Sequence, residues 1–172
     1  MVVVHRDFPA LVARAEQIII GTVSEVREGP DASGAPATFV TFSDVTVLKG
    51  DVGATLTVQL YGGTSGAHIP DMPRFSVGEQ DILFVAGNGR AVCPLVGVWQ
   101  GRFYVRTDPA SGIEVVEDSD HQPVLGLTGT ELKRAPLGRS AAASAPMSLA
   151  TFQQLILDEL AQPRATPSAP TP

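Results

Sequence analysis

The chain has 172 residues, 44% of them hydrophobic and 17% charged, which fits one globular domain with additions at its ends. Its formal net charge of -6 argues against a nucleic-acid partner, because phosphate backbones are bound by clustered Lys and Arg side chains. The single cysteine, Cys93, excludes an internal disulfide and a cysteine-based zinc site.

No run of the sequence is long and apolar enough to span a bilayer, and the amino terminus lacks the basic and apolar regions of a signal peptide. Met1 nevertheless precedes Val2–Val4 and a helical segment very abruptly. We therefore hypothesise that a leader has been removed or that the start codon was assigned downstream of one. An upstream reading frame without a signal peptide would refute this hypothesis.

A short amphipathic helix is expected over residues 7–15. Asp7 can cap it, Pro9 is tolerated in its first turn, and apolar residues recur at i, i+3, i+4 and i+7. Such a helix carries one apolar face that can cover a core.

Three β segments follow, joined by a loop over Gly29–Ala37 and a turn at Lys49–Asp51. The opening Ile18–Ile20 is apolar on both faces, as in a core or barrel strand. The last segment alternates, so Leu56, Val58 and Leu60 should face the core. The three predicted strands are Ile18–Val26, Thr38–Leu48 and Ala54–Tyr61.

A long Gly- and Pro-rich connection, from Gly62 through Pro73, is the best candidate for a functional surface, because compact domains rarely keep such loops without a packing or functional reason. Beyond it, turn signals at Gly87–Gly89 and Gln100–Gly101 separate further β segments. These predicted strands are Asp81–Ala86, Ala91–Val98, Arg102–Arg106 and Ile113–Val116.

The carboxyl-terminal part divides into three segments by composition. Residues 119–146 have the irregular pattern of an extended linker or arm. Residues 147–161 predict an amphipathic helix capped by Ser148, which packs on the body or on a partner. Residues 162–172 are Pro-rich and predict a disordered tail. The domain itself is expected over residues 1–118.

Several residues could belong to an enzyme. Ser65 lies in a glycine-rich loop, but its spacing fails the GxSxG pattern by one residue. Cys93 lies in an apolar segment with no base nearby, and His68 with Asp71 could bind a divalent ion only weakly. The acidic residues Glu114, Glu117, Asp118 and Asp120 are more typical of a solvated face than of a catalytic pair.

A binding surface without catalysis explains the candidates better, so no catalytic residue, metal site or cofactor is predicted. Aromatic rings near Gln100 could stack on a ligand, and the long loop could lie beside them. The residues expected to form a ligand or partner surface are His68, Asp71, Arg74, Trp99, Gln100, Arg102 and Tyr104.

Landmarks in the β region resemble those of an uncharacterised group of exported bacterial proteins. They are residues 15–23, 47–50, 62–63, 73–79 and 96–103. Residues 15–23, 47–50 and 78–84 are also distantly similar to the netrin-like module of tissue inhibitors of metalloproteinases. The likeness covers about ninety residues in the middle of the chain and is one of pattern, which says more about fold than about activity.

The resemblance implies a mainly β fold: an OB-fold-like, closed or partly open Greek-key barrel of five strands with a short N-terminal and an amphipathic C-terminal helix. It also implies export, secreted or periplasmic, and a protein partner, with proteases as one class. The residues themselves show no signal peptide, so a cytoplasmic location stays open as the alternative. The inhibitors' amino-terminal cysteine is absent, so their zinc-chelating mechanism does not carry over.

We therefore expect a non-enzymatic binding or protein-interaction domain, without a nucleic-acid partner or a membrane span. Two alternatives remain open: a hydrolase or metal-dependent enzyme using the 62–75 loop, and a structural accessory domain of an envelope assembly. The sequence leaves the oligomeric state open.

Overall fold

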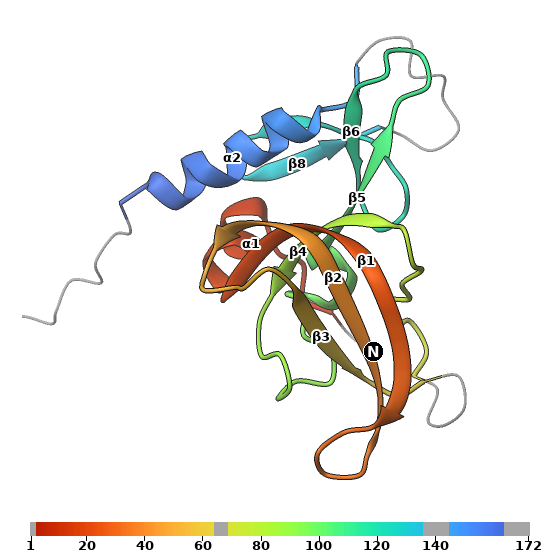
Figure 1. Cartoon of the computed structure of the whole chain (residues 1–172). Coiled ribbons are helices and arrows are strands. Elements are labelled where there is room, and N and C mark those ends of the chain that lie inside the picture. The colour runs from red at the N-terminus through yellow and green to blue at the C-terminus, as the bar shows by residue number, and fades with distance from the viewer. Residues whose placement is uncertain (1–2, 64–68, 136–144, 164–172) are drawn as a thin grey trace, which may run out of the picture.

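The computed structural model of the protein describes residues 3–63, 69–135 and 145–163 (Figure 1). Its described part is mainly β. The helices are α1 (Phe8–Arg14) and α2 (Leu149–Ala161), with a 3₁₀ turn η1 (Val98–Gly101). The strands are β1 (Gln17–Pro30), β2 (Pro36–Lys49), β3 (Leu56–Tyr61), β4 (Gln80–Val85), β5 (Arg102–Thr107), β6 (Glu114–Glu117), β7 (Val124–Thr128) and β8 (Glu131–Arg134).

Six strands form one antiparallel sheet in the order β3-β2-β1-β4-β5-β6, and β7 pairs with β8 in a separate hairpin. The first four strands have the Greek-key order, in which a long connection returns the fourth strand to lie beside the first. The connection from Tyr61 to Gln80 is long because it must pass β2 and β1 to reach the far side of β1. The mainly β class and the two predicted helices are confirmed. The sheet does not close within the described residues, so a closed barrel is not observed.

The sheet separates two apolar cores, because successive strand residues point to opposite faces. Ile18 and Ile20 belong to the core under the helices, whereas Ile19 belongs to the core enclosed by β1, β2 and β3. All three are at most 5% exposed. The prediction that this segment is apolar on both faces is therefore confirmed.

Both helices lie on the same face of the sheet, and both caps form as expected. The Asp7 side chain accepts a hydrogen bond from the Ala10 N–H at 3.0 Å, and Ser148 caps α2 in the same way through Thr151. Phe152 of α2 packs against Phe8 of α1, with ring centroids 6.0 Å apart. None of the helices in the described ranges has the length and apolar character needed to cross a membrane.

The predicted strand Ala91–Val98 is wrong. Residues 91–97 form turns and bends with one isolated bridge, between Val85 and Leu95, and η1 follows. Gly97 and Val98 both have positive φ, 63° and 61°, so two successive residues leave the extended conformation of a strand. Leu95 and Val96 pack in the two cores without extended backbone, whereas Val92 is 51% exposed.

The irregular arm expected over residues 119–146 instead contains the β7–β8 hairpin. Val124 and Leu132 are 0% and 7% exposed and belong to the core under the helices. The hairpin therefore packs as part of the body. Residues 136–144 of that segment and 164–172 of the predicted tail lie outside the described residues.

The first hairpin is also longer than expected. β1 and β2 continue to Pro30 and Pro36, so the connecting loop covers residues 31–35 instead of Gly29–Ala37. The Asp31 side chain accepts hydrogen bonds from the backbone N–H groups of Ser33 and Ala35 and closes the turn. The outer half of this hairpin extends beyond β4, while its β2 strand pairs with β3 (Figure 1).

Candidate functional site

The structure divides four of the predicted surface residues between two cavities. Trp99, Gln100 and Arg102 line a cavity of about 330 Å³ between the N-terminal segment, η1 and the β7–β8 hairpin, here called the hairpin cavity. Arg74 lines a second cavity of about 170 Å³, here called the loop pocket. The loop pocket lies between the inner face of β1–β3 and the connection that follows Tyr61.

The other predicted residues lie elsewhere. The Tyr104 ring stacks on His121, with centroids 4.2 Å apart, and burial raises the pKa of the Tyr104 hydroxyl. Asp71 is exposed and is part of neither cavity wall. His68 lies outside the described residues, as does Ser65. The predicted residues therefore do not converge on one site in the part of the chain that the structure describes.

Arg102 is the centre of a buried ionic network. Its side chain is 3% exposed, and its Nη2 lies 2.9 Å from Glu79 Oε2 and 3.0 Å from Asp81 Oδ2. Its Nη1 donates to the backbone carbonyl of Arg74, and its guanidinium lies 3.9 Å from the Phe75 ring centroid. Arg102 thus fastens the end of the long connection onto β4 and β5.

Asp81 titrates abnormally in this network. Its other oxygen, Oδ1, is buried and has no hydrogen-bond partner among the described residues. Loss of hydration therefore outweighs the attraction of Arg102 and raises the pKa of Asp81 to about 6. Because the network is buried and holds the loop, its role is to position the connection.

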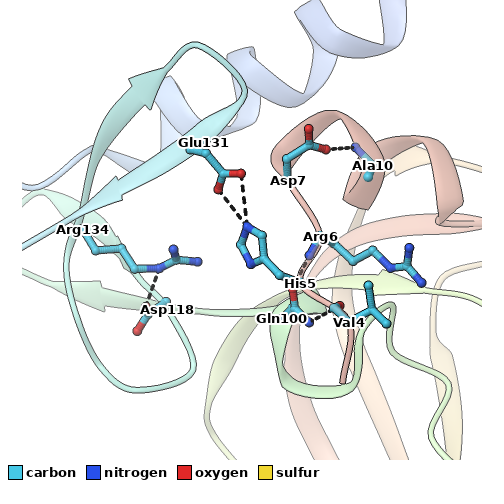
Figure 2. Close-up of polar contacts among 9 residues, drawn as sticks. All are labelled: Val4, His5, Arg6, Asp7, Ala10, Gln100, Asp118, Glu131 and Arg134. Atoms are coloured by element: carbon cyan, nitrogen blue, oxygen red, sulfur yellow. Dashed lines mark hydrogen bonds and ion pairs between the residues drawn. The ribbon is translucent and has the colours of Figure 1, made fainter. Parts of the chain in front are cut away.

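Gln100 uses its side chain to hold the N-terminal segment at the hairpin cavity (Figure 2). Its Oε1 accepts from the Arg6 N–H at 2.7 Å, and its Nε2 donates to the Val4 carbonyl at 3.0 Å. Gly97 and Val98, which come before Trp99 and Gln100, both have positive φ. This left-handed conformation is strained for Val98, because its side chain is β-branched. This turn sets the direction of Gln100 toward the segment.

Polar side-chain contacts hold the rest of the hairpin cavity wall (Figure 2). His5 Nε2 lies 2.9 Å from Glu131 Oε2, and Arg134 Nε lies 2.6 Å from Asp118 Oδ2. Asp118 also accepts from two backbone N–H groups of its own turn. These polar groups bind one another and fasten the N-terminal segment to the hairpin, so this cavity is the weaker candidate for a ligand.

The loop pocket has a different lining, mostly apolar. Leu60 is buried at its base, and the Thr38 Oγ1 donates to the Gly62 carbonyl at 2.8 Å, which satisfies the polar groups there. Val26 and Tyr61 are each 37% exposed. The remaining apolar wall consists of Ile69, Met72, Pro73 and Phe75.

Phe75 fixes the wall of the loop pocket in place. Its ring packs edge-on against Phe42, with centroids 5.8 Å apart, and its other face meets the Arg102 guanidinium. Because the Arg74 carbonyl is held inward by Arg102, the Arg74 side chain is exposed, and it has no partner among the described residues. The result is a mostly apolar pocket with the cationic Arg74 beside it and the acidic Glu28 also in its wall.

Sequence reasoning selected this connection but missed Val26, Tyr61, Ile69 and Met72. A usable signal was present, since Ile69 and Met72 are large apolar residues in an otherwise small and polar loop. Val26 and Tyr61 could not be linked to it without the strand register, which pairs β1 with β2 and β2 with β3.

Of the residues considered for an enzyme, Asp71, Cys93 and the acidic cluster of Glu114, Glu117, Asp118 and Asp120 lie in the described part of the chain. No group of three or more His, Cys, Asp or Glu side chains there could hold a metal ion. Glu117 pairs with Arg106 at 2.8 Å, and Asp118 pairs with Arg134, so two members of the acidic cluster already have cationic partners. Burial raises the pKa of the Cys93 thiol, which disfavours the reactive thiolate.

Comparison with known protein families, with curated proteins and with solved structures found no match to this chain.

Proposed function

We propose that the chain is a non-enzymatic protein-interaction domain whose loop pocket receives an apolar side chain of a partner protein. The observation that carries the proposal is the pocket itself, which has a mostly apolar lining with Glu28 in its wall, half-exposed Val26 and Tyr61, and at its rim Arg74, which has no partner among the described residues. Tyr, Met and Arg are the residues enriched at the centres of protein interfaces.

The volume supports a side chain as the occupant. Sites for small organic ligands usually measure about 300–1,000 Å³. The loop pocket measures about 170 Å³, which suits one large side chain. Arg74 favours a partner that carries a carboxylate beside that apolar residue, because a guanidinium pairs with a carboxylate through two hydrogen bonds.

We also propose an OB-like fold for the body, open between β3 and β5. The order β3-β2-β1-β4-β5 is what an OB-type Greek-key barrel has when that one pairing is opened. The likeness of the sequence landmarks to exported bacterial proteins supports a place outside the cytoplasm, which fractionation of the producing cells would test.

A random-peptide phage library selected on the immobilised wild-type domain tests the function. We expect selected peptides to share an apolar residue next to an acidic one, with affinities then measured by calorimetry. Tyr61→Ser and Met72→Ser should weaken them about tenfold or more, as for residues at the centre of an interface. Val77→Ser is the matched control, because Val77 is 65% exposed and outside the pocket.

Two results would overturn the proposal. One is a set of selected peptides that bind the Tyr61 and Met72 variants as tightly as the wild type. The other is reproducible turnover by the wild type on a broad panel of hydrolase substrates, which would favour the enzymatic alternative.

A further inference from the structure

The two outermost strands of the sheet are both covered on their open sides. On β3, the Asn88 side chain bonds to the backbone of Gln59, and the Tyr61 N–H donates to the Val92 carbonyl at 2.8 Å. On β6, the Val116 N–H donates to the Met147 carbonyl at 3.0 Å. Proteins cover strand edges in this way because unpaired backbone groups recruit other strands.

The outer half of β1 is different. β4 pairs with Gln17–Thr22 only, and Val23 exchanges hydrogen bonds with Gly78 and Glu79. Beyond Val23, residues 25–30 pair with β2 without any register shift, from Glu25 opposite Thr41 to Pro30 opposite Pro36. This stretch of β1 is a regular strand with one side not paired to β4.

The pairing geometry identifies which groups face that open side. Gln59 and Tyr61 direct their N–H groups away from β2. The backbone N–H and C=O groups of Leu60, which lies between them, therefore point toward β2 and its partner Thr38. The direction of the backbone N–H and C=O groups alternates along each antiparallel strand. The backbone groups of Phe39 on β2 and of its partner Arg27 on β1 therefore point toward each other. The N–H and C=O of Val26 therefore point outward, and they have no partner among the described residues.

Another half-open stretch, Asp44–Leu48 of β2, lacks this regularity. Asp44 has a φ of 51°, and the pairing of this part of β2 with β1 contains register shifts. Bulges and irregular backbone of this kind prevent strand addition. The outer half of β1 is thus the better template for another strand.

The side chains of β1 make that template complementary to itself. In a two-fold antiparallel pairing centred on Val26, each Val26 exchanges two backbone hydrogen bonds with its counterpart. Glu25 then lies directly opposite Arg27 of the second copy, and Arg27 lies opposite Glu25. Both residues are exposed, and opposite charges directly across a strand pair stabilise it, whereas like charges destabilise it.

We propose that the protein self-associates through the outer half of β1, forming a two-fold dimer with a continuous sheet across the two copies. Each dimer would contain two Glu25–Arg27 ion pairs. The proposal does not rest on the partner-binding function: Val26, at the centre of the pairing, also lines the loop pocket, but Glu25 and Arg27, which the test changes, do not.

Sedimentation over a concentration series, up to the solubility limit, tests the proposal with four proteins. The wild type should form dimers. Glu25→Lys places Lys opposite Arg27, and Arg27→Glu places Glu opposite Glu25. Each single variant should therefore have a dimer dissociation constant raised about tenfold or more. The double variant should dimerise as the wild type does.

Mixing the two single variants tests the register itself. A Glu25→Lys chain paired with an Arg27→Glu chain has opposite charges at both positions, so the mixture should form heterodimers at concentrations at which each variant alone is mostly monomeric. Glu114→Lys, an equal charge change at an exposed position on β6, is the control and should dimerise normally.

A wild type that remains monomeric at every concentration would overturn the proposal. So would single variants that dimerise as tightly as the wild type, because the dimer would then use another surface. A mixture that stays monomeric would overturn the register centred on Val26. Circular dichroism of each variant establishes that the fold is kept.

Discussion

The side-chain amide of Asn88 takes the place of a neighbouring strand beside Gln59. Its Oδ1 accepts from the Gln59 N–H at 2.9 Å, and its Nδ2 donates to the Thr57 carbonyl at 2.8 Å. One residue of the β4–η1 connection thus satisfies both a donor and an acceptor of the β3 edge, where unpaired groups would recruit other chains.

Asn88→Ala should therefore destabilise the protein and promote aggregation. Two hydrogen bonds are lost, for an expected decrease in the free energy of unfolding of about 1–2 kcal/mol. Urea denaturation measures this decrease, and light scattering during heating measures aggregation. Arg90→Ala, in the same connection, is the control: its side chain is 71% exposed and pairs only with exposed Glu16, so its loss should stay below about 0.5 kcal/mol. Equal effects of the two variants would contradict the edge-covering role.

Arg102 and Arg106 lie on the same strand but should differ strongly in their contribution to stability. Arg102→Met leaves Asp81 buried without its cation, which typically costs about 3–5 kcal/mol. Arg106 is 54% exposed, so Arg106→Met should cost less than about 1 kcal/mol. Urea unfolding curves compare the two losses. The double variant Arg102→Met/Asp81→Leu should recover part of the stability lost in Arg102→Met. If it is no more stable than Arg102→Met, the unpaired Asp81 carboxylate is not the cause of that loss.

The raised pKa of Asp81, about 6 against an ordinary value of 3.8, makes stability depend on pH. Between these values the folded chain holds a proton that the unfolded chain has lost, so the free energy of unfolding decreases as pH rises from about 4 to 6. Below this window the contribution is fully present, and above it the contribution is lost. Asp81→Asn cannot titrate, so the wild type should lose stability relative to this variant across the window. Urea titrations at several pH values measure the difference, and parallel pH profiles would show that Asp81 does not titrate there.

Elements defined by local chemistry could be predicted from the sequence. The helix caps at Asp7 and Ser148 depend on residues three positions away, and both bonds form. Leu56, Val58 and Leu60 alternate in sequence and are at most 9% exposed in the structure. In these segments the pattern of a few neighbouring residues determines the element.

Segments that depend on distant contacts could not be predicted. The β7–β8 hairpin is held by the Phe8 N–H, which donates to the Thr130 carbonyl at 2.9 Å, and by burial of Leu132. Residues 91–98 have the composition of a strand, but the Val96 N–H donates to the Phe84 carbonyl at 2.9 Å while Gly97 turns the chain away. No local pattern contains either interaction.

The same limit applies to the candidate site. The sequence predicts Arg102 as part of a ligand or partner surface, yet its side chain is buried between Glu79, Asp81 and Phe75. The register that places β5 beside β4 brings these groups together. A cation with two acidic residues about 20 positions away gives no sequence pattern that distinguishes a buried network from an exposed one.

The β7–β8 hairpin should contribute to the stability of the whole domain, in contrast to a linker. Leu132 is 7% exposed and packs in the core under the helices, so Leu132→Ala should lower the free energy of unfolding by about 2–4 kcal/mol through lost burial and the cavity left behind. Leu127→Ala is the matched control on the same hairpin, since Leu127 is 36% exposed, and it should cost less than about 1 kcal/mol. Urea unfolding followed by the fluorescence of Trp99 and by circular dichroism measures both. Because the hairpin and the helices share one core, the two signals should shift together in Leu132→Ala. A loss no larger than that of the control, or a transition in only one signal, would indicate that the hairpin unfolds independently of the body.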